Sequence, residues 1–231
     1  MRSRSEARGA PGNRRAEREQ MVSAQIESRG IADPLVLAAM REVPREAFVP
    51  ASMTDFAYQD GPLPIGEGQT ISQPYIVAVM TALARPRRGG RMLEIGTGSG
   101  YGAAVLSQIA SDVYTVERLG ALASAARRRL ERLGCGNVHV LEGDGTLGWP
   151  EHAPYDAIVV TAGGPKVPGA LLAQLRVGGR LVMPVGESTR FQRLVVVFRR
   201  TKDDYERELL EEVAFVPLIG AQGWPDERPA A

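Results

Sequence analysis

The sequence predicts an α/β fold: a doubly wound, mostly parallel sheet with an antiparallel hairpin at its C-terminal end and a helical cap at its N-terminal end. From residue 91 onward, short apolar runs alternate with helical stretches, the pattern of parallel strands joined by crossover helices. Near the C-terminus, two apolar runs are separated only by a polar stretch, which predicts a hairpin. Before residue 91, helix start and stop signals predominate.

Composition limits the classes of function. The chain has 231 residues, 44% of them hydrophobic and 24% charged, as in an ordinary soluble domain. A net charge of +1 creates no field that attracts nucleic acid or an anionic membrane, so neither is expected as a partner. A monomer is expected, although composition does not determine the oligomeric state. One cysteine, Cys135, and two histidines cannot build a disulfide or a cysteine-rich zinc site. We therefore expect no metal, no exported or membrane-spanning chain, and a cytoplasmic location.

Three regions are expected along the chain. Residues 1–20 have almost nothing to bury, which predicts a disordered tail, and interspersed glutamates argue against a basic nucleic-acid arm. Residues 21–84 are expected to form the helical cap together with a loop, and residues 85–224 the α/β core, packed with the cap as one unit.

The cap region has clear helix boundaries. A helix is predicted over 14–29 with Gly30 as its stop, although its first turns overlap the expected tail. A second helix begins at Asp33 and Pro34 and ends before Pro44.

An apolar loop follows the cap helices. Residues 58–74 contain too many Gly and Pro residues for regular structure, yet their Leu and Ile side chains must pack against something. The next helix is predicted over 74–84, with Pro74 in its first turn and Ser72 or Gln73 as its cap. Ser72 therefore has a purely structural interpretation.

The core is predicted as an alternation of strands and helices. An arginine cluster at residues 127–129 and 132 is interpreted as a solvated outer helix face. The predicted strands are 91–95, 112–116, 138–141, 156–160 and 180–184, the helices 101–110, 119–133 and 168–176, and the hairpin strands 191–198 and 209–219.

The strongest motif is a glycine-rich turn over 94–102, with the sequence EIGTGSGYG, between the first core strand and the next helix. Glycines let the backbone approach a ligand closely, and open parallel sheets bind ligands at the carboxyl ends of their strands. The spacing also satisfies the relaxed dinucleotide fingerprint, so the turn alone does not choose between cofactors.

Three acids at strand ends narrow the choice. Glu94 ends a strand that should be buried, so we expect it to meet a positive group. Glu117 ends the second strand, where an acid holds ribose hydroxyls in either cofactor class. Asp144, between two glycines, can accept from an exocyclic amine and so suggests an adenine edge. An ordinary Gly-Asp-Gly turn is the alternative.

Together these residues resemble the Rossmann-like class I S-adenosylmethionine-dependent methyltransferases. The resemblance implies S-adenosyl-L-methionine as cofactor, with the glycine loop along its methionine part, Glu117 on the ribose and Asp144 at the adenine. The implied cofactor-binding residues are Glu94, Gly96, Gly98, Gly100, Glu117, Asp144 and Gly145.

A sharper resemblance runs from Met21 to about Trp224. Eight ordered segments are similar to the protein-L-isoaspartate (D-aspartate) O-methyltransferases: MVSAQIESRGI, VPREAFVP, GQTISQPYI, LEIGTGSGYG, GDGTLGW, PYDAIVVTAGG, QLRVGGRLVMPVG and VAFVPLIG. The resemblance implies methyl transfer to the free carboxylate of L-isoaspartyl, and also D-aspartyl, residues in damaged proteins and peptides. Repair then begins through a succinimide.

The same resemblance implies the acceptor site. The loop that contains Thr70, Ile71 and Ser72 becomes the substrate loop, with Ser72 as the active-site residue, and the segment from Val216 is expected to bind the substrate backbone. Because a carboxylate acceptor is already ionised at neutral pH, no general base is needed, and none is evident.

The chain departs from the family pattern at three places. Tyr75 replaces a His found in several relatives, Gly102 replaces a larger polar residue, and Gly163-Gly164 replaces an Ala pair. None of these changes removes a required functional group.

Three other classes remain as alternatives. A methyltransferase for amines, nucleobases or catechols is one, although residues 161–164 lack the Pro-Pro-Tyr stretch of the amide and adenine enzymes and Cys135 lacks a preceding Pro. A nicotinamide-dependent oxidoreductase and a catalytically dead cofactor-binding adaptor are the others.

Overall fold

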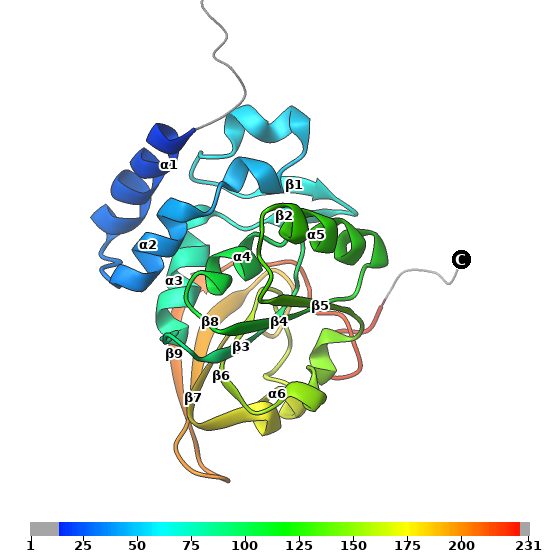
Figure 1. Ribbon diagram of the computed structural model, residues 1–231. Coiled ribbons are helices and arrows are strands. Elements are labelled where there is room, and N and C mark those ends of the chain that lie inside the picture. The colour runs from blue at the N-terminus through cyan, green and yellow to red at the C-terminus, as the bar shows by residue number, and fades with distance from the viewer. Residues whose placement is uncertain (1–13, 227–231) are drawn as a thin grey trace, which may run out of the picture.

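The computed structural model describes residues 14–226, and a seven-stranded sheet forms its centre (Figure 1). The strand order is β5-β4-β3-β6-β7-β8-β9; the first five strands in this order are parallel, and β8 and β9 are antiparallel to their neighbours. The chain winds outward from β3 in both directions, so the predicted doubly wound α/β class is confirmed. The strands are β3 (Arg91–Ile95), β4 (Asp112–Glu117), β5 (Val138–Glu142), β6 (Tyr155–Val160), β7 (Leu175–Val185), β8 (Gln192–Arg199) and β9 (Tyr205–Val213).

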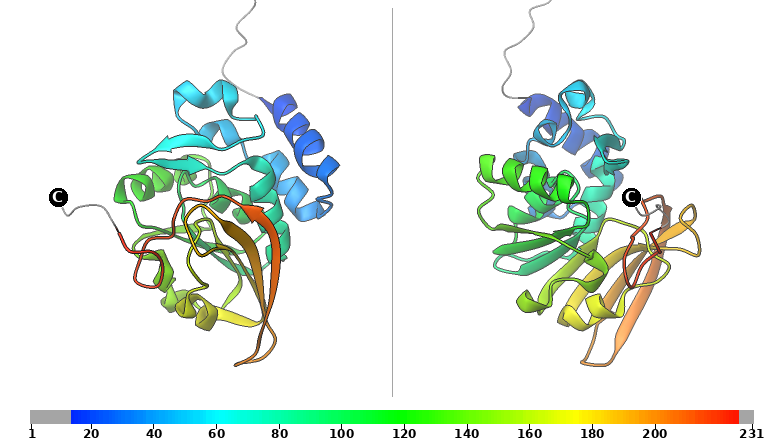
Figure 2. Two further views of the ribbon diagram at one scale, coloured as in Figure 1. Left: turned by 180° about the vertical axis from the view of Figure 1, so that it is seen from behind. Right: turned by 90° about the vertical axis from the view of Figure 1, so that its right-hand side faces the viewer.

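Both faces of the sheet are covered (Figure 2). Alternate residues of each strand point to opposite faces, so Val182 packs in the cluster with α3 and α4, whereas Leu181 and Met183 pack in the cluster with α6. This two-sided burial explains the apolar strand runs in the sequence. The helices are α3 (Pro74–Ala84), α4 (Tyr101–Ser107), α5 (Gly120–Arg132) and α6 (Gly169–Gln174).

The N-terminal cap is helical, as predicted, but its first helix changes type along its length. The predicted helix over 14–29 is observed as α1 (Arg15–Met21), a π-helical turn η1 (Val22–Ile26) and a 3-10 turn η2 (Glu27–Arg29), ending at Gly30 with φ of 93°. Residues 15–20 are therefore helix rather than tail, and the rest of the predicted tail, residues 1–13, lies outside the described residues. The cap continues with α2 (Pro34–Glu42), η3 (Arg45–Phe48) and η4 (Ala51–Phe56).

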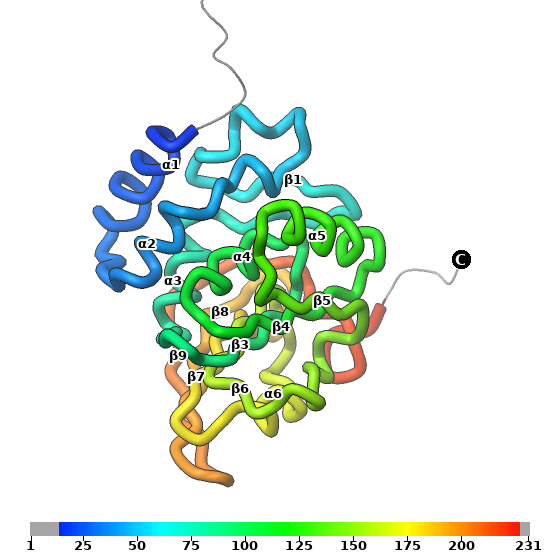
Figure 3. The backbone as a smooth tube through the Cα atoms, viewed as in Figure 1, coloured from blue at the N-terminus to red at the C-terminus, as the bar shows by residue number. Residues whose placement is uncertain are grey.

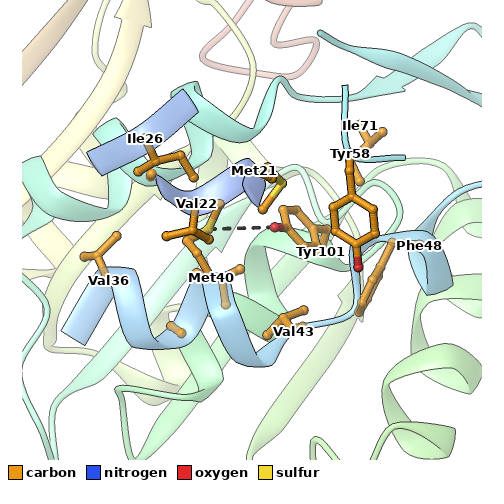
Figure 4. Close-up of a cluster of buried hydrophobic side chains, with 14 of the residues drawn as sticks. Met21, Val22, Ile26, Val36, Met40, Val43, Phe48, Tyr58, Ile71 and Tyr101 are labelled. Atoms are coloured by element: carbon orange, nitrogen blue, oxygen red, sulfur yellow. Dashed lines mark hydrogen bonds between the residues drawn. The ribbon is translucent and has the colours of Figure 1, made fainter. Parts of the chain in front are cut away.

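The cap shares its hydrophobic core with the sheet-packing helix α4 (Figure 4). The Tyr101 ring of α4 packs against Phe48 of the cap, with ring centroids 5.5 Å apart in an edge-to-face arrangement. The Tyr101 hydroxyl lies 3.8 Å from the sulfur of Met40 on α2. Because Tyr101 belongs to the glycine-rich turn over 94–102, its packing in the cap core also holds that turn in position.

A buried arginine links two turns of the cap. Arg45 is fully buried, and its Nε donates to the carbonyl of Ala57 at 2.8 Å while its guanidinium lies over the Tyr101 ring. Removing a buried donor leaves a buried acceptor unmatched, which typically costs about 1 to 3 kcal/mol.

We expect Arg45→Met to lower the free energy of unfolding by about 1 to 3 kcal/mol, because the Ala57 carbonyl then loses its partner. Urea denaturation measures this. Arg41→Met on α2 is the matched control, since the Arg41 ion pairs are exposed and should contribute less than about 1 kcal/mol. Equal effects of the two substitutions would contradict the assigned role.

The substrate loop contains more structure than predicted. It forms a hairpin of β1 (Leu63–Gly66) and β2 (Gln69–Ile71), so the expectation of no regular structure over 58–74 was wrong. Glu67 and Gly68 have φ of 53° and 68°, the positive angles of a tight type I′ turn. Helix α3 begins at Pro74 as predicted, but neither Ser72 nor Gln73 caps it through a side chain.

The observed bounds of two elements in the second half of the chain differ from the predicted ones. The strand predicted over 209–219 is observed as β9 over 205–213. Its first residues are charged and face solvent at the edge of the sheet, so they lack the apolar pattern from which a strand is predicted. The chain then leaves the sheet, passes beside Gly163 and continues toward α6 (Figure 3). The helix predicted over 168–176 ends at Gln174, where β7 begins.

Candidate functional site

The glycine loop lies where the strand order reverses, between the carboxyl ends of β3 and β6. Gly96 has φ of 93°, and a Cβ atom there would lie 2.4 Å from the Thr161 Oγ1 at the end of β6. Gly100, with φ of 91°, is the N-cap residue of α4. Both positions favour glycine for the backbone angle, and Gly96 also needs it for space. Open sheets of this type bind ligands at this place.

A cavity of about 1160 Å³, counted out to its open mouth, lies over this loop. The substrate loop, the strand ends and the C-terminal segment all line it. Of the predicted site residues, only Gly100 and Asp144 are outside the lining. The predicted residues that line the cavity are Thr70, Ile71, Ser72, Glu94, Gly96, Gly98, Glu117, Gly145 and Val216.

Glu117 fixes the glycine loop from the end of β4. Its Oε2 accepts from the N–H of Gly98 at 2.8 Å, and its Oε1 accepts from the N–H of Leu119 at 3.0 Å. The side chain is buried and lines the cavity. Each carboxylate oxygen can accept a second hydrogen bond, so Glu117 can still receive a pair of vicinal hydroxyls.

Glu94 is fully buried, and its hydrogen-bond partner is a hydroxyl group. The Thr115 hydroxyl donates to Oε2 at 2.6 Å and in turn contacts the Thr97 hydroxyl at 2.7 Å. Among the described residues, no Lys, Arg or His side chain contacts it. Burial raises the pKa of Glu94 to about 8, and the nearby charge of Glu117 also raises it. The carboxyl is therefore largely protonated at neutral pH.

Asp144 braces the chain instead of facing the cavity. Its Oδ1 accepts from the Thr146 backbone N–H and hydroxyl at 2.9 and 2.7 Å, and its Oδ2 accepts from the N–H of Ala221 at 2.7 Å. Asp144 therefore stabilises its own turn, which is the alternative that the sequence analysis allowed. It also contacts the C-terminal segment. Contact of Asp144 with an adenine edge stays a prediction.

The cavity lining beside Ser72 offers a hydroxyl group but no strong base. Ser72 is partly exposed, lines the cavity, and makes no hydrogen bond to another described residue through its hydroxyl. Around the mouth, the lining within residues 14–226 includes no His, Lys or Cys side chain. The two histidines stack instead on the Tyr114 ring, at 4.8 Å for His139 and 4.1 Å for His152.

The segment from Val216 is held by a buried amide. The Gln192 side chain pairs with the backbone of Phe215, accepting from its N–H and donating to its carbonyl, both at 3.0 Å. The Val216 carbonyl accepts from the N–H of Gly163 at 2.8 Å. A Cβ at Gly163 would lie 2.4 Å from Gln192 atoms, so this glycine makes room for the clamp.

Two residues near the cavity were missed by the sequence analysis. Ser99 lines it, and its buried Oγ has no hydrogen-bond partner among the described residues. Arg129 is half-buried and donates to the Ser99 carbonyl at 2.6 Å, so it is not on the solvated face predicted for the arginine cluster. The position of Ser99 inside the glycine turn was a usable signal, whereas the contact with Arg129 depends on tertiary packing.

A model of the protein-L-isoaspartate(D-aspartate) O-methyltransferase family matches residues 16–223. The chain belongs to this family. It is 64% identical over 212 residues to protein-L-isoaspartate O-methyltransferase 2 of Pelobacter propionicus, covering 92% of this chain and 94% of that relative.

Solved structures agree with the family assignment. A protein-L-isoaspartate O-methyltransferase structure superposes with a TM-score of 0.80 at 33% identity, covering 89% of this chain and 67% of the other. A Plasmodium falciparum structure described as a putative member, in complex with S-adenosyl-L-homocysteine, has a TM-score of 0.76 at 23% identity, covering 87% and 98%, and supports the fold.

Two kinds of feature are absent from the described residues. No helix within residues 14–226 is long and apolar enough to cross a membrane. The same residues contain no group of three or more His, Cys, Asp or Glu side chains arranged to hold a metal ion.

Proposed function

We propose that this protein transfers a methyl group from S-adenosyl-L-methionine to the free carboxylate of L-isoaspartyl residues, and also D-aspartyl residues, in damaged proteins and peptides. The observation that carries the proposal is that the segment from Thr70 to Ser72 and the glycine loop line one cavity. The names of the relatives and the cofactor product held by a structure of the same fold support it.

The residues present fit this cofactor. It supplies a methyl group bound to a cationic sulfur. The unpaired buried hydroxyl of Ser99 offers a hydrogen bond to a polar ligand atom, and Glu117 offers acceptor capacity for a ribose. Glu94 offers a carboxyl group with no protein cation to neutralise it. We assign cofactor binding to these residues together with Gly96, Gly98, Gly100, Asp144 and Gly145.

The acceptor side fits a nucleophile that needs no activation. A free carboxylate with a pKa of about 3.3 to 4 is ionised at neutral pH, so the lining needs only to align it and exclude water. Ser72 supplies a neutral hydroxyl that can donate to one carboxylate oxygen, while Thr70, Ile71 and Val216 border the same space. The neighbouring backbone nitrogen then attacks the ester carbonyl, methanol leaves with the amide proton, and water opens the resulting succinimide without the enzyme.

Composition supports a proposal for the cellular location and the partners of this enzyme. With a net charge of +1 and one free cysteine, Cys135, the proposed enzyme is a cytoplasmic monomer whose partners are isoaspartyl-containing proteins, not nucleic acid or membranes. Residues 21–84 would contribute the cap and substrate loop, and residues 85–224 the cofactor-binding core.

One assay tests the proposal. The protein is incubated with methyl-labelled S-adenosylmethionine and a pair of peptides that differ only in containing isoaspartate or aspartate. We expect labelled ester on the isoaspartyl peptide alone. Equal labelling of both peptides, or labelling of neither, would refute the proposed acceptor.

Ser72→Ala should lower turnover at least about tenfold, because the acceptor carboxylate loses a positioned donor. Since Ser72 caps no helix through its side chain, the free energy of unfolding should change by less than about 1 kcal/mol. Ser23→Ala, on the exposed side of the cap, is the control. A loss of activity that matches a loss of folded protein would show that Ser72 is structural.

A further inference from the structure

The space occupied by the buried Glu94 carboxyl depends on a glycine in the next helix. Gly102 lies in the first turn of α4, and a Cβ atom built on it would lie 2.2 Å from Oε1 of Glu94. The atoms found within 4 Å of that position both belong to the Glu94 carboxyl. The Cβ of an alanine at position 102 would therefore collide with this carboxyl group.

Glu94 in this position is isolated from compensating charge. Thr115 donates one hydrogen bond to it from β4, and the nearby Glu117 disfavours its ionised form further. The sequences of α3 and α4 contain no acidic or basic residue. An isolated, desolvated carboxyl favours its neutral form, and burial raises the pKa of Glu94 to about 8.

Bound cofactor would favour the ionised form of the Glu94 carboxyl over the neutral form. Its methionine part carries a sulfonium and an ammonium group, and Glu94 lines the same cavity as the glycine loop that would receive it. A cation near a buried carboxyl favours the ionised form. Glu94 must then give its proton to solvent when the cation arrives.

We propose that Gly102 is a positioning residue that seats the Glu94 carboxyl against α4 and thereby couples cofactor loading to the release of one proton. The inference rests on the proposed cofactor site but adds a residue and a linkage to it. A side chain at position 102 would push the carboxyl toward the open cavity, where water could solvate its ionised form.

Calorimetry in buffers of different ionisation enthalpy tests the linkage with S-adenosylmethionine alone. At pH 7 the unmodified protein should release about one proton per cofactor, and its affinity should rise about tenfold per pH unit between pH 6 and 7. In Gly102→Ala, proton release should fall to less than about half, and the pH dependence of affinity should flatten correspondingly. Gly136→Ala is the control, because a Cβ there meets nothing within 4 Å.

A second readout needs no cofactor. Gly102→Ala should lower the melting temperature in the Glu94 background but not in the Glu94→Ala background, since alanine otherwise favours a helix. If Gly102→Ala does not fold, Glu94→Ala/Gly102→Ala should restore folding, because the carboxyl is the group displaced.

The outcomes separate this inference from the proposed function. Proton release that is the same in Gly102→Ala, or that persists in Glu94→Gln, would overturn the coupling even if isoaspartyl methylation is intact. Failure of S-adenosylmethionine to bind the unmodified protein would overturn the cofactor site and the coupling with it.

Discussion

Glu117→Ala should weaken S-adenosylmethionine binding on the order of 100-fold while leaving the fold intact. The substitution removes the group proposed to hold the ribose and also the acceptor that orients the glycine loop through the N–H of Gly98. A ribose hydroxyl left without its acceptor in the complex costs about 1 to 3 kcal/mol, and about 2.7 kcal/mol corresponds to 100-fold in affinity. Calorimetric titration of the variant with S-adenosylmethionine measures the change.

The chain provides a matched control for this prediction. Glu142 pairs with Glu117 in the register of β4 and β5 and also ends its strand, but it is exposed and does not line the cavity. Glu142→Ala should change affinity by less than about threefold, as is usual for exposed charges. Similar losses in the two variants would point to a general field effect and against a specific ribose contact.

Glu94→Gln should stabilise the cofactor-free protein as pH rises. The folded-state pKa of about 8 lies above the ordinary value of 4.5, so between these values the folded protein keeps a proton that the unfolded chain has lost. The free energy of unfolding therefore falls with rising pH through this window, by up to about 1.4 kcal/mol per unit. Glutamine does not titrate, so the variant should be more stable than the unmodified protein by about 3 kcal/mol at pH 7.

Urea denaturation without cofactor at pH 5, 6, 7 and 8 measures this difference. It should be small at pH 5 and grow toward pH 8, and the same variant should bind S-adenosylmethionine more weakly because no carboxylate can form. Glu142→Gln, at an exposed position, should show no such growth. A stability difference that is constant with pH would show that Glu94 is ionised in the empty site.

Local patterns in the sequence were sufficient to predict the sheet and the glycine loop. The parallel strands are apolar runs because both of their faces are buried, and Gly96 and Gly100 are needed for positive φ angles within a short turn. The positions of Glu94 and Glu117 at strand ends follow from the same local pattern. These features depend on neighbouring residues, so a single sequence reveals them.

Features that depend on distant parts of the chain could not be predicted. Asp144 accepts a hydrogen bond from the N–H of Ala221, which is 77 positions away in the chain. No local sequence pattern predicts this contact. The start of β9 was missed because its side chains are exposed at a sheet edge. The expectation of a positive group beside Glu94 is met by no protein side chain that the structure describes, because the fold leaves this buried carboxyl to a hydroxyl partner. In each case tertiary packing determined the result.

The central claim is that the protein aligns an already ionised carboxylate with the methyl donor and uses no general base. Single-turnover methyl transfer to an isoaspartyl peptide, with the enzyme saturated by S-adenosylmethionine and quenched in acid, tests this claim most directly. The rate should be nearly flat between about pH 6 and 8, because the ionisation of a free carboxylate barely changes there. A rate that rises tenfold per pH unit across this range, in stable enzyme, would contradict the account and indicate an essential base.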